Sequence, residues 1–228
     1  MTDRYFSAET LKFLTALTLN NHRTWFEEHK GSYEALVREP ALRLIGDFAP
    51  TLKRISRHLT AVDKKVGGSL MRIHRDTRFS GDKSPFKTNI GIQFRHVAGK
   101  DIHAPGLYFH IAPDECFVAA GIWHPDPETL SRIRGRIVEK PRLWHKASRD
   151  PAFRDVFELG GESLARPPRG VSGDHPDVED LKRKDHIAAA PLTVRELSSP
   201  KLLEILYNRF SVTAPYVRFL CDAVELPF

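Results

Sequence analysis

The stretch GLYFHIAPDECFVAAGIW, residues 106–123, decides the fold because it reads as two short strands joined by one tight turn. Pro113-Asp114 suits the centre of such a turn, since proline and aspartate both favour turn conformations. An antiparallel hairpin closed there has a register set by its turn. The expected partners across the two strands are Ala112 with Glu115, His110 with Phe117, and Tyr108 with Ala119.

Side chains along a strand alternate between the two faces of its sheet. One face of this hairpin would carry Tyr108, His110, Phe117, Ala119, Gly121 and Trp123. The other would carry Leu107, Phe109, Ile111, Cys116, Val118, Ala120 and Ile122. Because both faces are largely apolar, we expect the hairpin to be central in the sheet and covered on both sides.

The flanking sequence predicts more strands and helices. Ile90, Ile92 and Phe94 continue the period of two, and HIAAAPLTV at 186–194 is compatible with a short strand. Helical signals precede and follow this region, and 164–181 reads as a long ordered loop. The expected helix-boundary residues are Ser7, Pro40, Asp126-Pro127 and Ser199-Pro200, with a break near Pro215. We predict an α+β fold for residues 1–228 as a single domain, a largely antiparallel sheet packed with N-terminal and C-terminal helices.

Composition narrows the class of protein. A chain of 228 residues, 41% hydrophobic and 28% charged, can bury a sizeable core. It has no run of about 18 apolar residues and no secretory signal pattern, so no membrane association is expected. Cys116 and Cys221 lie far apart without metal-ligand spacing, which favours a reducing cytoplasm. Without a P-loop or zinc motif, neither a cofactor nor a metal is predicted.

A second stretch, RIHRDTRFSGDKSPFKTN at 72–89, concentrates charge. Its five cations and two carboxylates give a net charge of +3, half of the formal +6 of the whole chain. The alternation of its residues favours an extended segment over a helix, and Gly81, Asp82 and Ser84-Pro85 indicate a turn. Such a density of cations points to a local anionic partner.

The first functional hypothesis is therefore a pocket for a phosphate or carboxylate ligand, since arginine presents a planar fork of donors to such groups. The expected ligand-binding residues are Arg72, Arg75, Arg78 and Lys87, with Trp25 and Tyr108 (and Trp123) as an aromatic wall. If the site is catalytic, Asp76 is the candidate general base and Lys83 the electrostatic stabiliser. His110 is a further candidate, although a hydrogen-bonded core histidine is the competing interpretation. For Trp25, packing beside His29 on a helix is the competing interpretation.

The charged stretch also resembles a known family. It is similar to the bacterial and fungal proteins grouped as domain-of-unknown-function family 2461, whose pattern is Arg-x-x-Arg-Asp-x-Arg-Phe-x-x-x-Lys-x-x-Tyr. The matching residues here are Arg72, Arg75, Asp76, Arg78, Phe79 and Lys83, with Phe86 where the pattern has tyrosine. Further similar stretches are NNHRTWFEEHK at 20–30, GLYFHIAP at 106–113, GIWHP at 121–125 and LKRKDH at 181–186. The resemblance brings no activity with it, but Phe86 speaks against a mechanism that needs a tyrosine hydroxyl at that position.

Two other hypotheses remain. A sequence pI near 9.4 permits nucleic-acid binding, although no helix-turn-helix, RNA-recognition or zinc-finger motif is present. Alternatively, the charged stretch is a structural network of ion pairs, which contribute little each when exposed. A pocket into which several of the five cations converge would favour the anion hypothesis. Arginines that are each paired to a carboxylate would favour the network. The sequence defines no oligomeric state.

Overall fold

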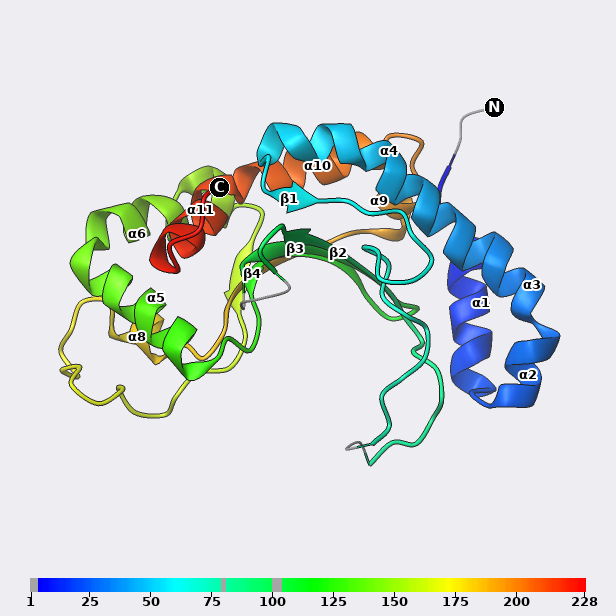
Figure 1. The fold of residues 1–228 in the computed structure, drawn as a ribbon, viewed down its shortest axis with the longest axis horizontal. Coiled ribbons are helices and arrows are strands. Elements are labelled where there is room, and N and C mark those ends of the chain that lie inside the picture. The colour runs from blue at the N-terminus through cyan, green and yellow to red at the C-terminus, as the bar shows by residue number, and fades with distance from the viewer. Residues whose placement is uncertain (1–3, 79–80, 100–103) are drawn as a thin grey trace.

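A computed structural model describes residues 4–78, 81–99 and 104–228 of the chain (Figure 1). The N-terminal helices are α1 (Ala8–Leu19), α2 (Arg23–Glu28), α3 (Lys30–Tyr33), the π-helical η1 (Glu34–Arg38) and α4 (Glu39–Ile55). The strands are β1 (Leu59–Thr60), β2 (Ile90–His96), β3 (Gly106–Ile111), β4 (Cys116–Ile122), β5 (Glu158–Gly160) and β6 (His186–Pro191). The remaining helices are α5 (Pro127–Glu139), α6 (Pro141–Ser148), α7 (Pro151–Arg154), α8 (Val178–Lys182), α9 (Val194–Leu197), α10 (Leu202–Val212) and α11 (Ala214–Ala223).

Six strands of the described chain form one antiparallel sheet in the order β1-β2-β3-β4-β6-β5. The predicted α+β fold is thus confirmed. The predicted hairpin register is also confirmed, with His110 opposite Phe117 and Tyr108 opposite Ala119. Ala112 N–H donates to Glu115 O at 2.8 Å and closes the turn.

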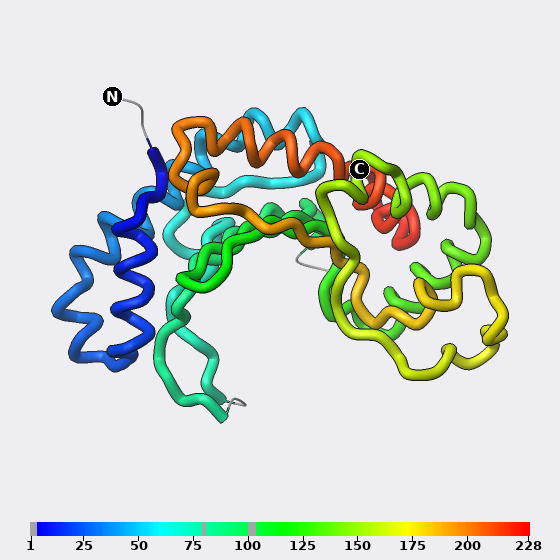
Figure 2. The backbone as a smooth tube through the Cα atoms, turned by 180° about the vertical axis from the view of Figure 1, so that it is seen from behind, coloured from blue at the N-terminus to red at the C-terminus, as the bar shows by residue number. Residues whose placement is uncertain are grey.

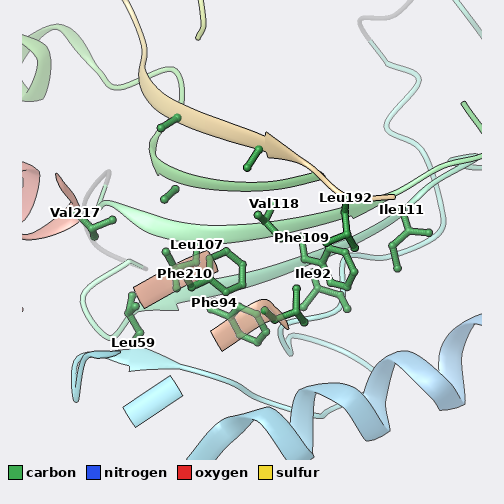
Figure 3. Packing of buried hydrophobic residues seen from close by; sticks show 14 of the residues in the cluster. Leu59, Ile92, Phe94, Leu107, Phe109, Ile111, Val118, Leu192, Phe210 and Val217 are labelled. Carbon is green, nitrogen blue, oxygen red and sulfur yellow. The ribbon is translucent and has the colours of Figure 1, made fainter. Parts of the chain in front are cut away.

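Helices α4 and α10 cover one face of the sheet, as the front and back views show (Figures 1 and 2). The buried side chains of the central strands point to this side, among them Phe94, Phe109 and Val118 (Figure 3). Phe210 of α10 lies within aromatic contact distance of Phe94, with ring centroids 6.1 Å apart. The core therefore lies between the sheet and these two helices.

The opposite face of the sheet is open, so the expectation that the hairpin is covered on both sides is wrong. Tyr108, His110 and Phe117 on this face are only partly buried, and Trp123 is 67% exposed. No helix of the described ranges lies across it; α5–α8 and α1–α3 stand at its two ends instead (Figure 1). An apolar strand pattern cannot distinguish a face covered by helices from one that lines a hollow, because both exclude charged residues.

Local signals located some helix boundaries and missed others. Ser7 caps α1 through a capping box with Thr10, and Asp126 caps α5 with Pro127 in its first turn. Chain direction changes between α10 and α11 at Thr213, next to Pro215. The long loop predicted at 164–181 follows β5 and ends in α8.

Pro40 lies in the first turn of α4, which continues from η1 without a break, so the predicted boundary there is wrong. Helix α10 begins at Leu202 after Lys201, and Ser199 is not its cap.

Gly121 is required where β4 meets β6. Its φ is +121°, and a Cβ built there would lie 2.0 Å from the carbonyl oxygen of His186. Both the backbone conformation and the close approach of the neighbouring strand therefore exclude a side chain.

We expect Gly121→Ala to lower the free energy of unfolding by about 3 kcal/mol or more, from backbone strain together with overpacking. Gly135→Ala is the matched control, because Gly135 is exposed within α5 and an added Cβ would meet no atom within 4 Å. That control should raise stability by about 0.5–1 kcal/mol. Urea unfolding of both variants measures the difference, and equal effects would contradict the role given to Gly121.

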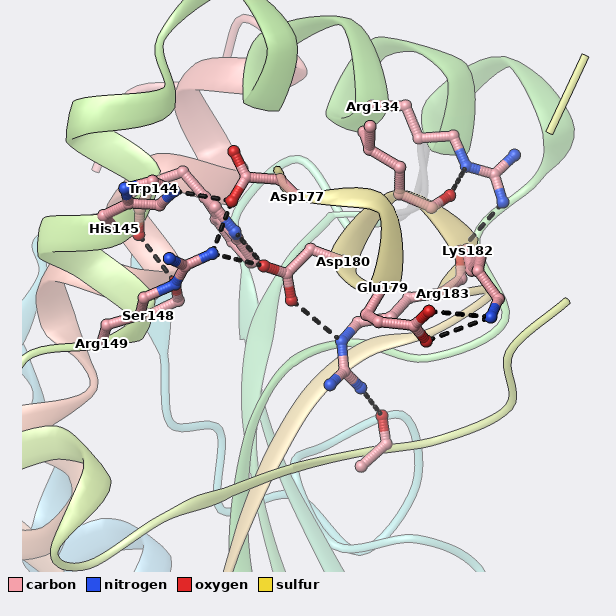
Figure 4. A network of polar contacts seen from close by, with 12 residues as sticks. Arg134, Trp144, His145, Ser148, Arg149, Asp177, Glu179, Asp180, Lys182 and Arg183 are labelled. Atoms are coloured by element: carbon pink, nitrogen blue, oxygen red, sulfur yellow. Dashed lines mark hydrogen bonds and ion pairs between the residues drawn. The ribbon is translucent and has the colours of Figure 1, made fainter. Parts of the chain in front are cut away.

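A buried polar network holds the end of the long loop against α6 (Figure 4). Asp177 has a fully buried side chain, and its Oδ1 accepts hydrogen bonds from His145 Nε2 at 2.6 Å and Arg149 Nη2 at 2.5 Å. Asp180 Oδ2 accepts from Trp144 Nε1 at 2.8 Å. The two carboxylates thereby fix the loop and α8 to α6.

His186, at the start of β6, is buried beside this network. Its ring lies edge-on to Trp144, and neither ring nitrogen has a hydrogen-bond partner among the described protein atoms. Burial is the main cause that lowers the pKa of His186 to about 3, with the neighbouring Arg183 charge adding to it. The ring is therefore neutral in the folded protein over the whole physiological range.

This burial makes stability depend on pH. Below about pH 6.5, the ordinary pKa of histidine, the unfolded chain binds a proton at residue 186. The folded chain binds that proton only near pH 3. The free energy of unfolding therefore falls as the pH drops through this window, and His186 accounts for about 2 kcal/mol of the loss between pH 7 and pH 5.

His186→Leu should remove this part of the pH dependence. The free energy of unfolding of the variant, minus that of the wild type, should therefore be about 2 kcal/mol more favourable at pH 5 than at pH 7. Urea titrations at the two pH values measure it. His74→Leu, which changes an exposed histidine, is the control for the loss of a histidine. A difference between H186L and wild type that is the same at both pH values would contradict the assignment.

Candidate functional site

The charged stretch forms the outer part of an irregular hairpin that projects from the sheet (Figure 1). Its two arms pair through the bridges Leu70–Ile92 and His74–Phe86. Arg75 N–H donates to Pro85 O at 2.9 Å, and Lys87 N–H donates to Ile73 O at 2.7 Å. The first arm is extended, as the alternation of its residues predicts, and residues 76–78 and 81–84 lie toward the tip.

The side chain of Asn21 anchors this hairpin to the N-terminal helices. Asn21 Nδ2 donates to Phe86 O at 2.9 Å, and Phe86 N–H donates to Asn21 Oδ1 at 3.1 Å. The Phe86 ring is buried and stacks on Phe26 of α2, with centroids 4.1 Å apart. The ring and backbone at position 86 make these contacts, and none of them requires a hydroxyl.

At the tip, Asp76 is held by arginines of its own segment. Arg78 Nε and Nη2 donate to the two carboxylate oxygens of Asp76 at 3.0 and 2.7 Å. Arg72 lies further off, with its Nη2 3.9 Å from Asp76 Oδ2. The hydrogen bonds from Arg78 are the main cause that lowers the pKa of Asp76 to about 2, so Asp76 is an ionised and weak base near pH 7.

The other charges of the tip are also engaged locally. Arg75 Nη1 contacts Asp82 and donates to Ser84 Oγ at 2.9 Å. Lys83 Nζ donates to Thr77 O at 2.9 Å. Lys87, near the base, is half-buried without a carboxylate partner in the described chain, and burial lowers its pKa, as does the charge of Arg72. Phe79 of the motif lies outside the described residues.

A cavity of about 690 Å³ occupies the open face of the sheet. The cross-strand pairs place its residues in rows, such as Gln93 opposite Tyr108 and Tyr108 opposite Ala119. Small residues contribute part of its floor, among them Gly106, Ala119 and Gly121. The lining residues used below are Gln93, Arg95, Tyr108, His110, Gly121 and Trp123.

Tyr108 and His110 form the polar wall of the cavity. Tyr108 OH lies 3.0 Å from His110 Nδ1, and Asn89 Nδ2 lies 3.5 Å from the same nitrogen. The His110 ring stacks on Phe117 at 4.6 Å. Burial lowers the pKa of His110 and raises that of Tyr108, which favours the neutral form of both groups near pH 7.

Arg95 of β2 brings a positive charge to the cavity. Its Nε and Nη2 both donate to Gln93 Oε1, at 2.9 and 2.6 Å. No carboxylate of the described residues forms an ion pair with it. Arg95 was not predicted as a site residue, because a single arginine in a strand is typical of an exposed position and no motif marks it.

Comparison with known protein families matched residues 9–219 to the family described as "Conserved hypothetical protein (DUF2461)". The chain belongs to this family. The predicted resemblance is therefore confirmed. No match was found among curated proteins or among solved structures.

In this DUF2461 protein, the predicted site residues lie in three places. Tyr108 and His110 line the cavity. Arg72, Arg75, Asp76, Arg78, Lys83 and Lys87 lie on the hairpin and are not among the cavity-lining residues. Trp25 lies on α2, where its ring stacks on His29 with centroids 4.0 Å apart.

Within the described ranges, the histidine, cysteine and carboxylate side chains form no group of three that could hold a metal ion. No described helix has both the length and the apolar composition needed to cross a membrane.

We expect Asn21→Ala to release the hairpin, because it leaves the buried N–H and C=O of Phe86 without partners. The loss of two hydrogen bonds should lower the free energy of unfolding by about 1–3 kcal/mol. Hydrogen exchange should accelerate at the amides of Arg75 and Lys87, which are bonded across the hairpin. Asn20→Ala is the control, because Asn20 donates only within α1, to Ala16 O. Unchanged exchange at Arg75 and Lys87 in N21A would contradict the anchoring role.

Proposed function

We propose that the protein binds a small anionic ligand with a flat apolar body in the cavity on the open face of its sheet. The observation that carries this proposal is the coincidence, in one hollow, of Arg95, a neutral Tyr108–His110 pair and a floor made partly of small residues. A volume of about 690 Å³ is in the range of sites for small molecules.

The dimensions of the sheet support a ligand about one aromatic ring wide. Arg95 stands on β2 and Trp123 follows β4, with β3 between them. Neighbouring strands lie about 4.8 Å apart, so the backbones that bear these two residues are roughly 10 Å apart across the sheet. A flat body can lie over the intervening glycine and alanine residues while its ends meet the two side chains.

Arg95 supports an anionic rather than a neutral ligand. Two of its donors are taken by Gln93, which leaves the rest of the guanidinium fork for a ligand. A guanidinium that lines an apolar cavity gains most from a carboxylate or phosphate, which can accept two hydrogen bonds at once. The anion hypothesis is thus retained, with Arg95 as its centre.

The hairpin cations contribute less to this proposal. Arg75 and Arg78 are paired with carboxylates within the tip, which fits a network that shapes the hairpin. Lys87 and Arg72 could attract an anion from solution, but they are not among the residues that line the cavity.

The test uses 4-hydroxybenzoate and phenyl phosphate as anionic probes and 4-hydroxybenzyl alcohol as the uncharged analogue. A probe at about 100 times its Kd should stabilise the protein by about 2.7 kcal/mol, or roughly 5–10 °C in Tm for a chain of this size. Arg95→Gln should weaken binding of the anions tenfold or more, because hydrogen bonds to a charged group contribute about 1.5–3 kcal/mol. Thermal shift and titration calorimetry measure both effects.

Arg72→Gln is the matched control, since Arg72 is an exposed arginine outside the cavity. It should leave the affinity for both probes unchanged. Loss of binding in R72Q with normal binding in R95Q would show that the anion binds at the hairpin and not in the cavity. Failure of both anionic probes to bind the wild type, or equal binding of the uncharged analogue, would contradict the proposal.

A further inference from the structure

His124 and Asp185 meet next to Trp123, a residue that lines the cavity, although they are 61 residues apart in sequence. His124 belongs to GIWHP and Asp185 to LKRKDH, two of the stretches that resemble the family. The Nδ1 atom of His124 lies 3.4 Å from Asp185 Oδ1. The carboxylate is buried, with 1% of its side chain exposed, whereas the imidazole is 57% exposed. The pair therefore presents its histidine to solvent and keeps its carboxylate inside.

The backbone at His124 departs from strand geometry. In a regular strand, adjacent side chains point to opposite faces. His124 instead has a φ of +48°, and its ring lies 4.3 Å from the ring of Trp123. Trp123 lines the cavity, and the imidazole, which is not itself a lining group, lies in contact with it. A histidine in this left-handed conformation is uncommon and is typical of a site that constrains it.

Asp185 is held in one orientation by two backbone donors. His124 N–H donates to Asp185 Oδ1 at 2.7 Å, and Glu162 N–H donates to Oδ2 at 2.8 Å. Gly161 allows this close approach, since a Cβ there would lie 2.4 Å from Asp185 Cβ. A carboxylate fixed beside Nδ1 favours the tautomer with a proton on Nδ1, which leaves the lone pair of Nε2 free to accept another proton.

We propose that His124 is a general base that activates water against an ester of the anionic ligand, with Asp185 as its positioning residue. This inference rests on the proposed ligand site. Arg95 would hold the anionic group, and the ester would extend over the glycine floor toward Trp123 and His124. The substrate class is an aryl ester that carries a carboxylate.

The proposed reaction is the hydrolysis of the ester by one water molecule. Nε2 of His124 removes a proton from water while the water oxygen forms a bond to the carbonyl carbon of the ester. The bond between that carbon and the phenol oxygen then breaks, and the imidazolium returns its proton to the departing phenolate. Ester and water become a carboxylic acid and a phenol, and Asp185 stabilises the imidazolium between the two steps.

The test measures hydrolysis of 4-acetoxybenzoate to acetate and 4-hydroxybenzoate. His124→Gly suits the left-handed backbone and so should fold. It should lower kcat by roughly 100-fold or more, the usual contribution of a general base. Binding of 4-hydroxybenzoate should be unchanged, and added imidazole should restore hydrolysis above its own rate in buffer. Arg95→Gln should raise KM tenfold or more with little change in kcat, and His74→Asn, at an exposed histidine outside the cavity, should change neither.

The role of Asp185 is tested by the same rescue in the double variant H124G/D185N. Imidazole should restore a smaller rate there than in H124G, because the added base is no longer oriented by the carboxylate. Equal rescue in the two variants would overturn the positioning role.

The two proposals fail in different ways. A wild type that binds 4-hydroxybenzoate but does not hydrolyse 4-acetoxybenzoate faster than buffer would overturn the role of His124 and leave the ligand site standing. Wild-type kcat in H124G would do the same. A wild type that binds none of the anionic probes would overturn both.

Discussion

The pairing of β3 with β4 is the constraint on which the rest of the molecule depends. Once Ala112 closes the turn on Glu115, every side chain of the hairpin is assigned to one of two faces, and a slip of one residue would exchange them. The face that carries Phe109 and Val118 then requires a cover, which α4 and α10 supply. The face that carries Tyr108 and His110 remains free to line a cavity.

Contact between apolar surface and water is unfavourable, and a large exposed apolar face therefore often marks a binding site. Here the small residues limit the apolar area, and the polar groups stand at the edges of the hollow. The residues of the proposed site stand near the ends of the strands: Arg95 on β2, and Trp123 with the neighbouring His124 after β4. Rigid strands thus position groups that loops alone would hold less accurately.

Sequence signals that depend only on residues close together in the chain predicted much of this fold. The turn at Pro113-Asp114 and the caps at Ser7 and Asp126 depend on neighbouring residues, so sequence alone revealed them. The open face was not predictable, because it depends on where helices distant in sequence come to pack. The candidate site was predicted only through Tyr108, His110 and Trp123. Arg95 bears no motif, and His124 meets Asp185 only through the pairing of β4 with β6.

That pairing has a consequence for the order in which the chain assembles. Strands β2, β3 and β4 are neighbours along the chain and close short loops, whereas β6 joins β4 only after residues 123–185 have folded back. Closing long loops costs more entropy and slows folding. During synthesis, β2, β3 and β4 leave the ribosome together with His124, whereas Asp185, β6 and the covering helix α10 follow later. His124 is therefore synthesised well before the carboxylate that contacts it, so the two residues can meet only after β6 has joined the sheet.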